Sequence, residues 1–183
     1  MEAPLPSGVR VRALTMHADE RGAFTEVFRG EWPTGIAPVQ WNVVRSEAKV
    51  LRGVHAHIRH ADYLIVASGR MMLGLRDLRR GSPTEGRTAL LDLRADALRA
   101  VTIPSGVAHG FLFLEPSIHI YAVSEYWNPE DELGCHWADP ALGIPWPLRD
   151  PLLSPRDRDA PPLRALLDRL APHQPIAVIA GKG

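Results

Sequence analysis

Short apolar runs separated by prolines and glycines recur along most of the chain and leave little room for long helices. The 183 residues include 17 prolines and 15 glycines. We expect residues 111–114 and 117–123 to pair across the turn at Glu115 and Pro116, and one helix at 162–170. Strands are predicted at residues 8–16, 23–28, 39–45, 63–67, 70–78, 87–93, 99–103, 111–114 and 117–123. This pattern predicts an all-β fold of the double-sheet, jelly-roll type.

The most unusual stretch runs from Leu51 to Gly69 and combines an Arg-Gly turn, three histidines and an aspartate. Alternate side chains of a strand point to the same face, so His55 and His57 are expected to project together. Imidazole is the side chain best suited to exchanging protons near neutral pH or to coordinating a transition metal. The apolar run at 63–67 then predicts a strand that enters the core and ends at Gly69.

The length is that of one domain, with residues 8–150 as a barrel and 151–183 as a C-terminal extension. The apolar end, PIAVIAGKG (175–183), is either a last strand or a tail that packs on a partner. The N-terminus lacks the apolar run of a signal peptide, and no segment is long enough to cross a bilayer. We therefore expect a cytoplasmic protein without a membrane partner.

Charge and cysteine content exclude several classes of protein. Lysines and arginines number 21 and acidic residues 21, so the net charge gives no electrostatic reason to expect nucleic acid binding. The lone cysteine, Cys135, excludes an internal disulfide and suits a reducing compartment. It could act as a nucleophile, but a small core residue is the commoner role of such a cysteine.

Two histidine-containing segments resemble the motifs of the cupin double-stranded β-helix. These are His55-x-His57 followed by Asp62 and Gly69, and Pro104-x-Gly106-x-x-His109. The histidines would then point into the mouth of the barrel, where ligands bind. His55, His57, Asp62 and His109 would suit Fe, Mn, Ni or Zn. Metal-free pocket histidines are the preferred interpretation, and the metal site is the alternative.

A longer resemblance, from Asp19 to about Leu163, is to the dTDP-4-dehydrorhamnose 3,5-epimerase family. Its pieces occur in the family's order, and no single one would be sufficient alone. They are DERGAFTEVF (19–28), VQWN (39–42), LRGVH (51–55), DLRRGSPTEG (77–86), IPSGVAHGFLFL (103–114), Tyr121, DPALGIPWPL (139–148) and LSPRD (153–157).

This resemblance implies a homodimeric cupin enzyme, without a cofactor, that acts on a nucleotide-linked 4-keto-6-deoxy sugar, with dTDP as the expected nucleotide. A base removes an acidic hydrogen beside the ketone, an enolate forms, and an acid returns a proton on the opposite face. His55 matches the family's base, Asp157 the aspartate that orients it, and Tyr121 the acid. His109 matches a pocket histidine.

The resemblance also implies which residues hold the nucleotide. Arg21, Phe24 and Glu26 match residues that contact the base and the diphosphate and that reach the neighbouring subunit's site in the family's dimer. Gln40, Asn42 and Arg52 match diphosphate and sugar contacts. Arginine suits this task because its planar fork pairs with phosphate oxygens.

Three positions depart from the family pattern. Asp62 stands where a lysine is expected to stabilise the enolate oxygen, and an anion there opposes the developing charge. Leu73 replaces a pocket aspartate, and His57 stands where the family usually has no histidine. His57 is accordingly a candidate substrate-binding residue.

These departures leave four hypotheses open. The first is an epimerase acting at C3, C5 or both, in which His57 takes over part of the lysine's role. The second is a sugar-nucleotide 3,4-ketoisomerase, because Gly53-Val-His-Ala-His57 resembles the Gly-x-His-Ala-His stretch of that family. The third is a metal-binding cupin in which the cation polarises the ketone. The fourth is a non-catalytic protein that binds sugar nucleotides.

Overall fold

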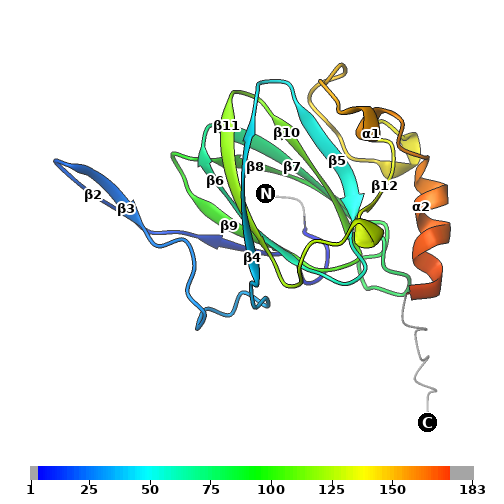
Figure 1. Cartoon of the computed structure of the whole chain (residues 1–183), viewed down its shortest axis with the longest axis horizontal. Coiled ribbons are helices and arrows are strands. Elements are labelled where there is room, and N and C mark those ends of the chain that lie inside the picture. Colours follow the sequence, from blue (N-terminus) through cyan, green and yellow to red (C-terminus); the bar gives the residue numbers. More distant parts are fainter. Residues whose placement is uncertain (1–3, 174–183) are drawn as a thin grey trace, which may run out of the picture.

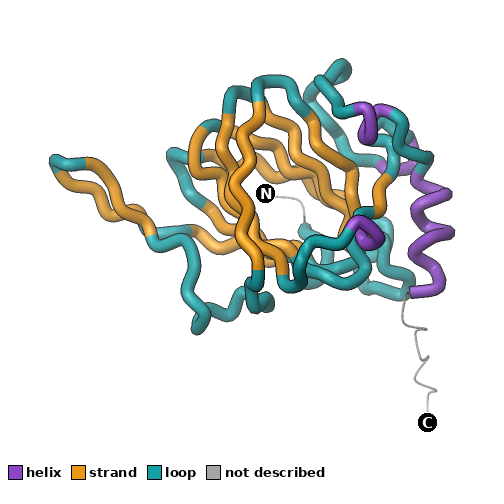
Figure 2. Tube along the Cα trace, in the orientation of Figure 1, coloured by secondary structure: helices purple, strands orange, loops and turns teal. Residues whose placement is uncertain are grey.

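Two antiparallel five-stranded sheets face each other in a computed structural model that describes residues 4–173 (Figures 1 and 2). One sheet has the order β1-β9-β6-β11-β4 and the other β12-β5-β10-β7-β8. The strands of the first are β1 (Arg10–Ala13), β4 (Gln40–Ser46), β6 (Asp62–Ser68), β9 (Arg99–Ile103) and β11 (Ser117–Val123). Those of the second are β5 (Leu51–Ala56), β7 (Arg70–Asp77), β8 (Thr88–Arg94), β10 (Val107–Phe113) and β12 (Leu133–Gly134). The predicted all-β jelly roll is confirmed.

The space between the sheets is apolar at one end and polar at the other. Leu64, Met71, Leu91, Val101 and Phe113, from five strands of both sheets, are fully or almost fully buried in one cluster. The inward side chains of β10 and β11 lead from this core toward the polar end through ring contacts between residues 109, 111, 119 and 121. A close-packed apolar core thus adjoins the polar cavity and supports the strands that line it.

The C-terminal part covers the outer face of the sheet that contains β5. Helix α2 (Leu163–Leu170) buries Leu163, Leu166 and Leu170 against this face, together with Val54 and Ala56. Since β5 alternates, Val54 and Ala56 face α2 while His55 faces the interior. Packing on both faces therefore fixes the direction in which His55 points.

A backbone ladder brings a short helix, α1 (Pro155–Arg158), next to β5. The Leu51 amide donates to the Leu152 carbonyl at 3.0 Å, and the Leu152 amide donates to the Lys49 carbonyl at 2.8 Å. Ser154 caps α1, and its side chain accepts from the Asp157 amide at 3.1 Å. Together these contacts bring a residue 102 positions away in the sequence to His55.

Strands β2 (Met16–Asp19) and β3 (Gly22–Thr25) form a separate hairpin that extends away from the barrel (Figure 1). The prediction of one strand at 8–16 is therefore wrong. Residues 10–13 pair with β9, and one further hydrogen bond joins the Leu14 amide to the Leu98 carbonyl. β2 pairs with β3 instead. The predicted strand at 23–28 likewise ends at Thr25.

The predicted hairpin between 111–114 and 117–123 is also wrong, although both segments contain strands. β10 pairs with β5 and β7, while β11 pairs with β4 and β6. Each of the two already has two neighbours, so the turn at 114–116 carries the chain from one sheet to the other. The remaining strand predictions agree with the structure to within one or two residues, apart from the longer β10.

The predicted helix at 162–170 corresponds to α2, and α1 adds a second short helix before it. Among the described residues, no helix has the length and apolar character needed to span a membrane. The segment 175–183, for which a strand or a tail was considered, lies outside the described residues.

Candidate active site

A cavity of about 290 Å³ opens at the polar end of the barrel, between the two sheets. Its walls come from β4, β6 and β11 on one side and from β5 and β10 on the other, and residues 132, 154, 156 and 157 also line it. Polar and ionisable side chains dominate the lining: Gln40, Asn42, Arg52, His55, His57, His60, Asp62, His109, His119, Tyr121, Glu132, Ser154, Arg156 and Asp157. The sequence prediction that the histidines point into the mouth of the barrel is confirmed.

His55 and Asp157 form a tightly bonded pair on one wall of the cavity. His55 Nε2 lies 2.8 Å from Asp157 Oδ1, and the Gly53 amide donates to Asp157 Oδ2 at 3.3 Å. Burial alone would raise the pKa of Asp157, but the hydrogen bond from His55, the charge of that histidine and the Gly53 and Ser154 bonds outweigh it and lower the pKa. Asp157 is therefore an ionised carboxylate in the folded protein.

This pairing fixes the tautomer of His55. An ionised carboxylate only accepts hydrogen bonds, so neutral His55 carries its proton on Nε2 and keeps a lone pair on Nδ1. The His55 side chain is 17% exposed and lines the cavity. A general base needs this arrangement, in which one nitrogen is anchored and the other is free.

Gly53 allows the close approach on which the pair depends. Its φ is +117°, and a Cβ at this position would lie 2.9 Å from the Gly110 Cα of the neighbouring strand. Any other residue would separate β5 from β10 and would move the amide that contacts Asp157.

Tyr121 lies on the opposite wall, on β11 of the other sheet. Its ring stacks on that of His119, with centroids 5.8 Å apart. Burial, together with the charges of Asp62 and Glu132, raises the pKa of Tyr121. The phenol therefore remains protonated at neutral pH and is a potential proton donor. His119 is buried, and its Nδ1 has no hydrogen-bond partner in the part of the chain that the structure describes. Burial lowers the pKa of His119 to about 4.

His57, His60 and His109 form a second group in the cavity. His57 and His60 stack with ring centroids 3.8 Å apart, and His109 lies 5.1 Å from His57. Burial and the neighbouring His60 lower the pKa of His57 to about 4. Burial and the neighbouring His57 and His55 lower the pKa of His109 well below its ordinary value. Both rings are therefore neutral at neutral pH.

Asp62 begins β6 at the edge of this group and is 5% exposed. Burial, and then the charges of Glu132 and Asp131, raise the pKa of its carboxyl well above the ordinary value. The other position that departs from the family pattern, Leu73, is fully buried in the apolar core below the cavity.

The predicted diphosphate contacts lie at the rim of the cavity. Gln40, Asn42 and Val44 face inward from β4, whereas Trp41 and Val43 on the other face are 45% and 66% exposed, as the alternation predicted. Gln40 donates to Asn42 Oδ1 at 2.9 Å and accepts from the Trp127 amide at 3.1 Å. Arg52 donates from Nε to Ser46 Oγ at 3.0 Å, so its guanidinium is held at the rim.

Arg21, Phe24 and Glu26 do not reach the cavity of the same chain. They lie on or beside the projecting β2–β3 hairpin, where Arg21 pairs with Asp19 and Glu26 with Arg29. Phe24 is 64% exposed. Their predicted role in binding a nucleotide therefore requires a second copy of the chain.

Several lining residues were not singled out from the sequence, namely His60, His119, Glu132, Ser154 and Arg156. His119 could have been found because it shares a strand face with Tyr121, two residues away. His60 belongs to the histidine-rich stretch. Glu132 lies in a segment without periodicity and carries no such signal. Arg156, which pairs with Glu132 at 3.2 Å, lies in the LSPRD segment of the family resemblance and could have been found there.

The four-residue metal set considered from the sequence is only partly assembled. Among the described residues, two groups have ligand atoms within 4.8 Å of one another: His57, Asp62 and His109, and His57, His60 and Asp131. His55 belongs to neither group, because its ring is turned toward Asp157. Cys135 is fully buried, and burial raises the pKa of its thiol to about 12, so a core role is confirmed and a nucleophilic role is excluded.

Known proteins resemble this chain over most of its length. The sequence profile of dTDP-4-dehydrorhamnose 3,5-epimerase matches residues 5–165. The dTDP-4-dehydrorhamnose 3,5-epimerase of Pseudomonas aeruginosa is 42% identical over 149 residues, which cover 76% of this chain and 82% of that protein. The dTDP-4-dehydro-6-deoxyglucose 3-epimerase of a Streptomyces species is 36% identical over 165 residues, which cover 85% and 84%.

Solved structures agree with the sequence comparison. ChmJ, a 3'-monoepimerase from Streptomyces bikiniensis in complex with dTDP-quinovose, superposes with a TM-score of 0.83 at 34% identity, covering 93% of this chain and 91% of that one. The RmlC epimerase of Mycobacterium tuberculosis gives a TM-score of 0.84 at 33% identity, covering 93% and 90%. The chain belongs to the dTDP-4-dehydrorhamnose 3,5-epimerase family, which has a cupin fold.

Proposed function

We propose that this protein epimerises a dTDP-linked 4-keto-6-deoxy sugar at C3, at C5 or at both carbons. The single observation that carries the proposal is the placement of an anchored histidine and a protonated phenol on opposite walls of one cavity. His55 comes from one sheet and Tyr121 from the other, and both line the same space. A sugar held between them has one face toward a base and the other toward an acid.

The reaction follows from this arrangement. His55 Nδ1 removes a hydrogen next to the ketone, and the resulting imidazolium is stabilised by the ionised Asp157 bonded to Nε2. The enolate then takes a proton from Tyr121 on the opposite face, which inverts the carbon. The ketone makes the adjacent hydrogens acidic, so this route needs no redox step. Asp157 acts through His55 and is a positioning residue.

The nucleotide is held at the rim of the cavity and, we propose, by a second subunit. Gln40, Asn42 and Arg52 face the cavity, and the Arg52 guanidinium is suited to a diphosphate oxygen. Arg21, Phe24 and Glu26 project on the hairpin and complete the site of a partner copy. Phe24 on the hairpin and Trp41 and Val43 on the outer face of β4 are exposed apolar residues, which favours their burial in a homodimer.

The cellular location is part of the same proposal. A lone cysteine, Cys135, buried in the core, and a nucleotide-linked substrate suit a reducing compartment, so we place the enzyme in the cytoplasm.

A 3,4-ketoisomerase is the second candidate, because His57 lies in the same cavity two residues after His55. In that reaction two neighbouring histidines move protons between adjacent carbons on one face of the sugar. The Nδ1 of His57 lies 3.1 Å from the Asp131 carbonyl and donates to it, so Nε2 keeps a lone pair that can accept a proton. Tyr121 on the opposite wall has no role in that reaction, which favours the epimerase.

Incubation with dTDP-4-keto-6-deoxyglucose in deuterium oxide, followed by NMR, tests both candidates. Inverted product with deuterium at C3 alone, at C5 alone or at both carbons supports the epimerase and defines its scope. A carbonyl that moves to C3 supports the isomerase. Absence of any deuterium incorporation refutes both and leaves a binding protein, for which titration with dTDP is the follow-up measurement.

A further inference from the structure

The carboxyl group of Asp62 is buried and has no hydrogen-bond partner among the described residues. No hydrogen bond to its oxygens is found within residues 4–173, although the side chain is only 7% exposed. The nearest nitrogens are His60 Nε2 and His109 Nε2, each 3.8 Å from a carboxylate oxygen. Two further carboxylates, on Glu132 and Asp131, add to the negative charge around it. Ionising a buried carboxyl without compensation costs several kcal/mol, so a cation beside Asp62 would stabilise its charged form.

Two neighbouring imidazoles present free lone pairs to the same place. His57 Nδ1 lies 3.1 Å from the Asp131 carbonyl, and His109 Nδ1 lies 3.2 Å from the Val107 carbonyl. A carbonyl oxygen only accepts, so each Nδ1 carries the proton and each Nε2 keeps its lone pair. Metal-binding histidines are typically held in this way, with the non-ligating N–H donated to a carbonyl or carboxylate.

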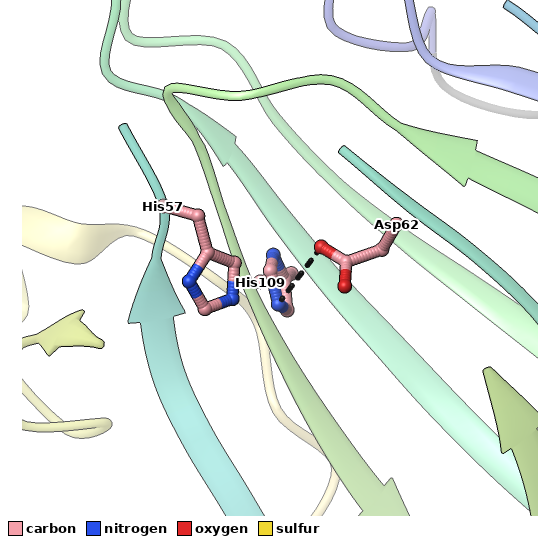
Figure 3. Close-up of side chains that lie close together, drawn as sticks. All are labelled: His57, Asp62 and His109. Carbon is pink, nitrogen blue, oxygen red and sulfur yellow. Dashed lines mark ion pairs between the residues drawn. The ribbon is translucent and has the colours of Figure 1, made fainter. Parts of the chain in front are cut away.

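The spacing of these atoms fits ligands of one ion better than partners in a hydrogen bond. The separation of 3.8 Å between His109 Nε2 and Asp62 Oδ2 exceeds hydrogen-bonding distance. Ligand atoms around an ion at about 2.0–2.2 Å lie roughly 3 to 4 Å from one another. Figure 3 shows His57, His109 and Asp62 gathered at one point of the interior, and their ligand atoms all lie within 4.8 Å of one another.

The alternative group of His57, His60 and Asp131 is less suitable. The Asp131 carboxylate already accepts hydrogen bonds from the amides of Ile58 and Arg59 and lies 3.1 Å from His60 Nδ1. These bonds hold the loop that carries His57. Asp131 is thus a structural support for the site, whereas Asp62 has its oxygens free.

We infer that His57, Asp62 and His109 form a mononuclear site for a divalent transition-metal ion. Two imidazoles and one carboxylate are a donor set suited to Zn²⁺, Mn²⁺ or Fe²⁺, and three protein ligands leave positions open for water or a substrate oxygen. The ion would lie in the cavity that also holds His55 and Tyr121. If the proposed function holds, it supplies positive charge next to the sugar ketone, where the enolate develops.

Metal binding can be measured without any assay of activity. The full-length protein is stripped with a chelator and titrated with Zn²⁺ by calorimetry and with Co²⁺ by visible absorption. We expect saturation at one ion per chain and d–d bands from nitrogen and oxygen ligands. Absence of saturable binding by the wild-type protein would overturn the inference.

Two substitutions and a matched control locate the ion. Asp62→Asn and His109→Gln are each expected to weaken binding by at least about 100-fold, because each removes a ligand. His173→Gln changes an exposed histidine of the 3-10 helix Ala171–His173, which is outside the cavity, and leaves binding unchanged. An Asp62→Asn variant that binds as tightly as the wild type contradicts the assignment.

Thermal unfolding keeps the test valid if one variant folds poorly. Zn²⁺ should raise the melting temperature of the wild type and of His173→Gln but not of Asp62→Asn or His109→Gln. Circular dichroism shows whether a variant is unfolded. If one ligand variant is unfolded, the melting temperature of the other ligand variant tests the site. A Zn²⁺-dependent rise in both ligand variants refutes the site.

Deuterium exchange into the sugar nucleotide separates this inference from the proposed function. Exchange by a protein that binds no metal leaves the epimerase standing and refutes the metal site. Saturable, Asp62-dependent metal binding without deuterium exchange supports the metal site and refutes the epimerase.

Discussion

Two buried carboxyl groups on opposite walls of the cavity have pKa values shifted in opposite directions. Asp157 bonds to His55 and accepts a hydrogen bond from the Gly53 amide, and its pKa is lowered. The side-chain oxygens of Asp62 accept no hydrogen bond among the described residues, and its pKa is raised. Both side chains are 7% exposed. The exposed fractions are thus equal, but hydrogen bonds outweigh burial at Asp157, whereas burial and two neighbouring carboxylates act together on Asp62. A partnered carboxylate orients a base, while an unpartnered one is a place for a cation.

The largest effect is expected for His55→Asn, which removes the base while keeping a polar side chain of similar reach. Turnover of the sugar nucleotide should fall by about 1,000-fold, since general-base catalysis commonly contributes 10²–10⁴-fold. Product formation followed by NMR measures the loss, and His173→Gln is the control. Activity within tenfold of the wild type would mean that the base lies on the other wall.

Asp157→Asn should reduce turnover by about 100-fold and destabilise the fold by about 2 kcal/mol, because it removes a charge-assisted hydrogen bond. The same carboxylate predicts a pH dependence of stability. Its folded pKa is depressed, so its contribution is complete above the unfolded value of about 3.9 and is lost as the pH falls below it.

Urea denaturation between pH 7 and pH 3 measures both effects. The stability difference between wild type and Asp157→Asn should be constant near neutrality and should shrink in acid. A difference that is the same at pH 3 and pH 7 would show that Asp157 is not stabilised as an anion.

The smallest effect is expected on the opposite wall and has the opposite sign. In the metal-free protein, Asp62→Asn removes a buried carboxyl whose raised pKa makes folding costly above its unfolded pKa, and the free energy of unfolding at pH 7 should increase by about 1 kcal/mol. Urea denaturation in the presence of a chelator measures this change. A loss of stability like that of Asp157→Asn would show that Asp62 has partners in the folded protein.

The sequence predicted those parts of the site that depend on strand alternation. Gln40 and Asn42 face the cavity and Trp41 faces outward, as their spacing requires. The resemblance predicted Asp157, because no local pattern could show that a residue of α1 meets β5. It also marked Asp62 and His57 as departures from the family.

The strand pairings and loop contacts that the sequence could not predict depend on residues far apart along the chain. β10 and β11 are adjacent in sequence but lie in different sheets, because each finds its neighbours elsewhere. The residues around Asp131 and Glu132 carry no periodicity, yet the Asp131 carboxylate holds the loop after β5. The pattern of residues 8–16 continues past Ala13. It therefore could not show that β1 ends there and that a separate hairpin begins at Met16.

In the proposed reaction, His55 on one wall of the cavity removes the proton and Tyr121 on the opposite wall returns one. Exchange measured with Tyr121→Phe in deuterium oxide tests it most directly, because washout of the substrate hydrogen and inversion are recorded in one NMR experiment. We expect Tyr121→Phe to exchange the hydrogen at the reacting carbon while forming at least about tenfold less inverted product, since His55 and Asp157 are intact. Equal loss of exchange and inversion in Tyr121→Phe, or inversion at the wild-type rate, would contradict the account.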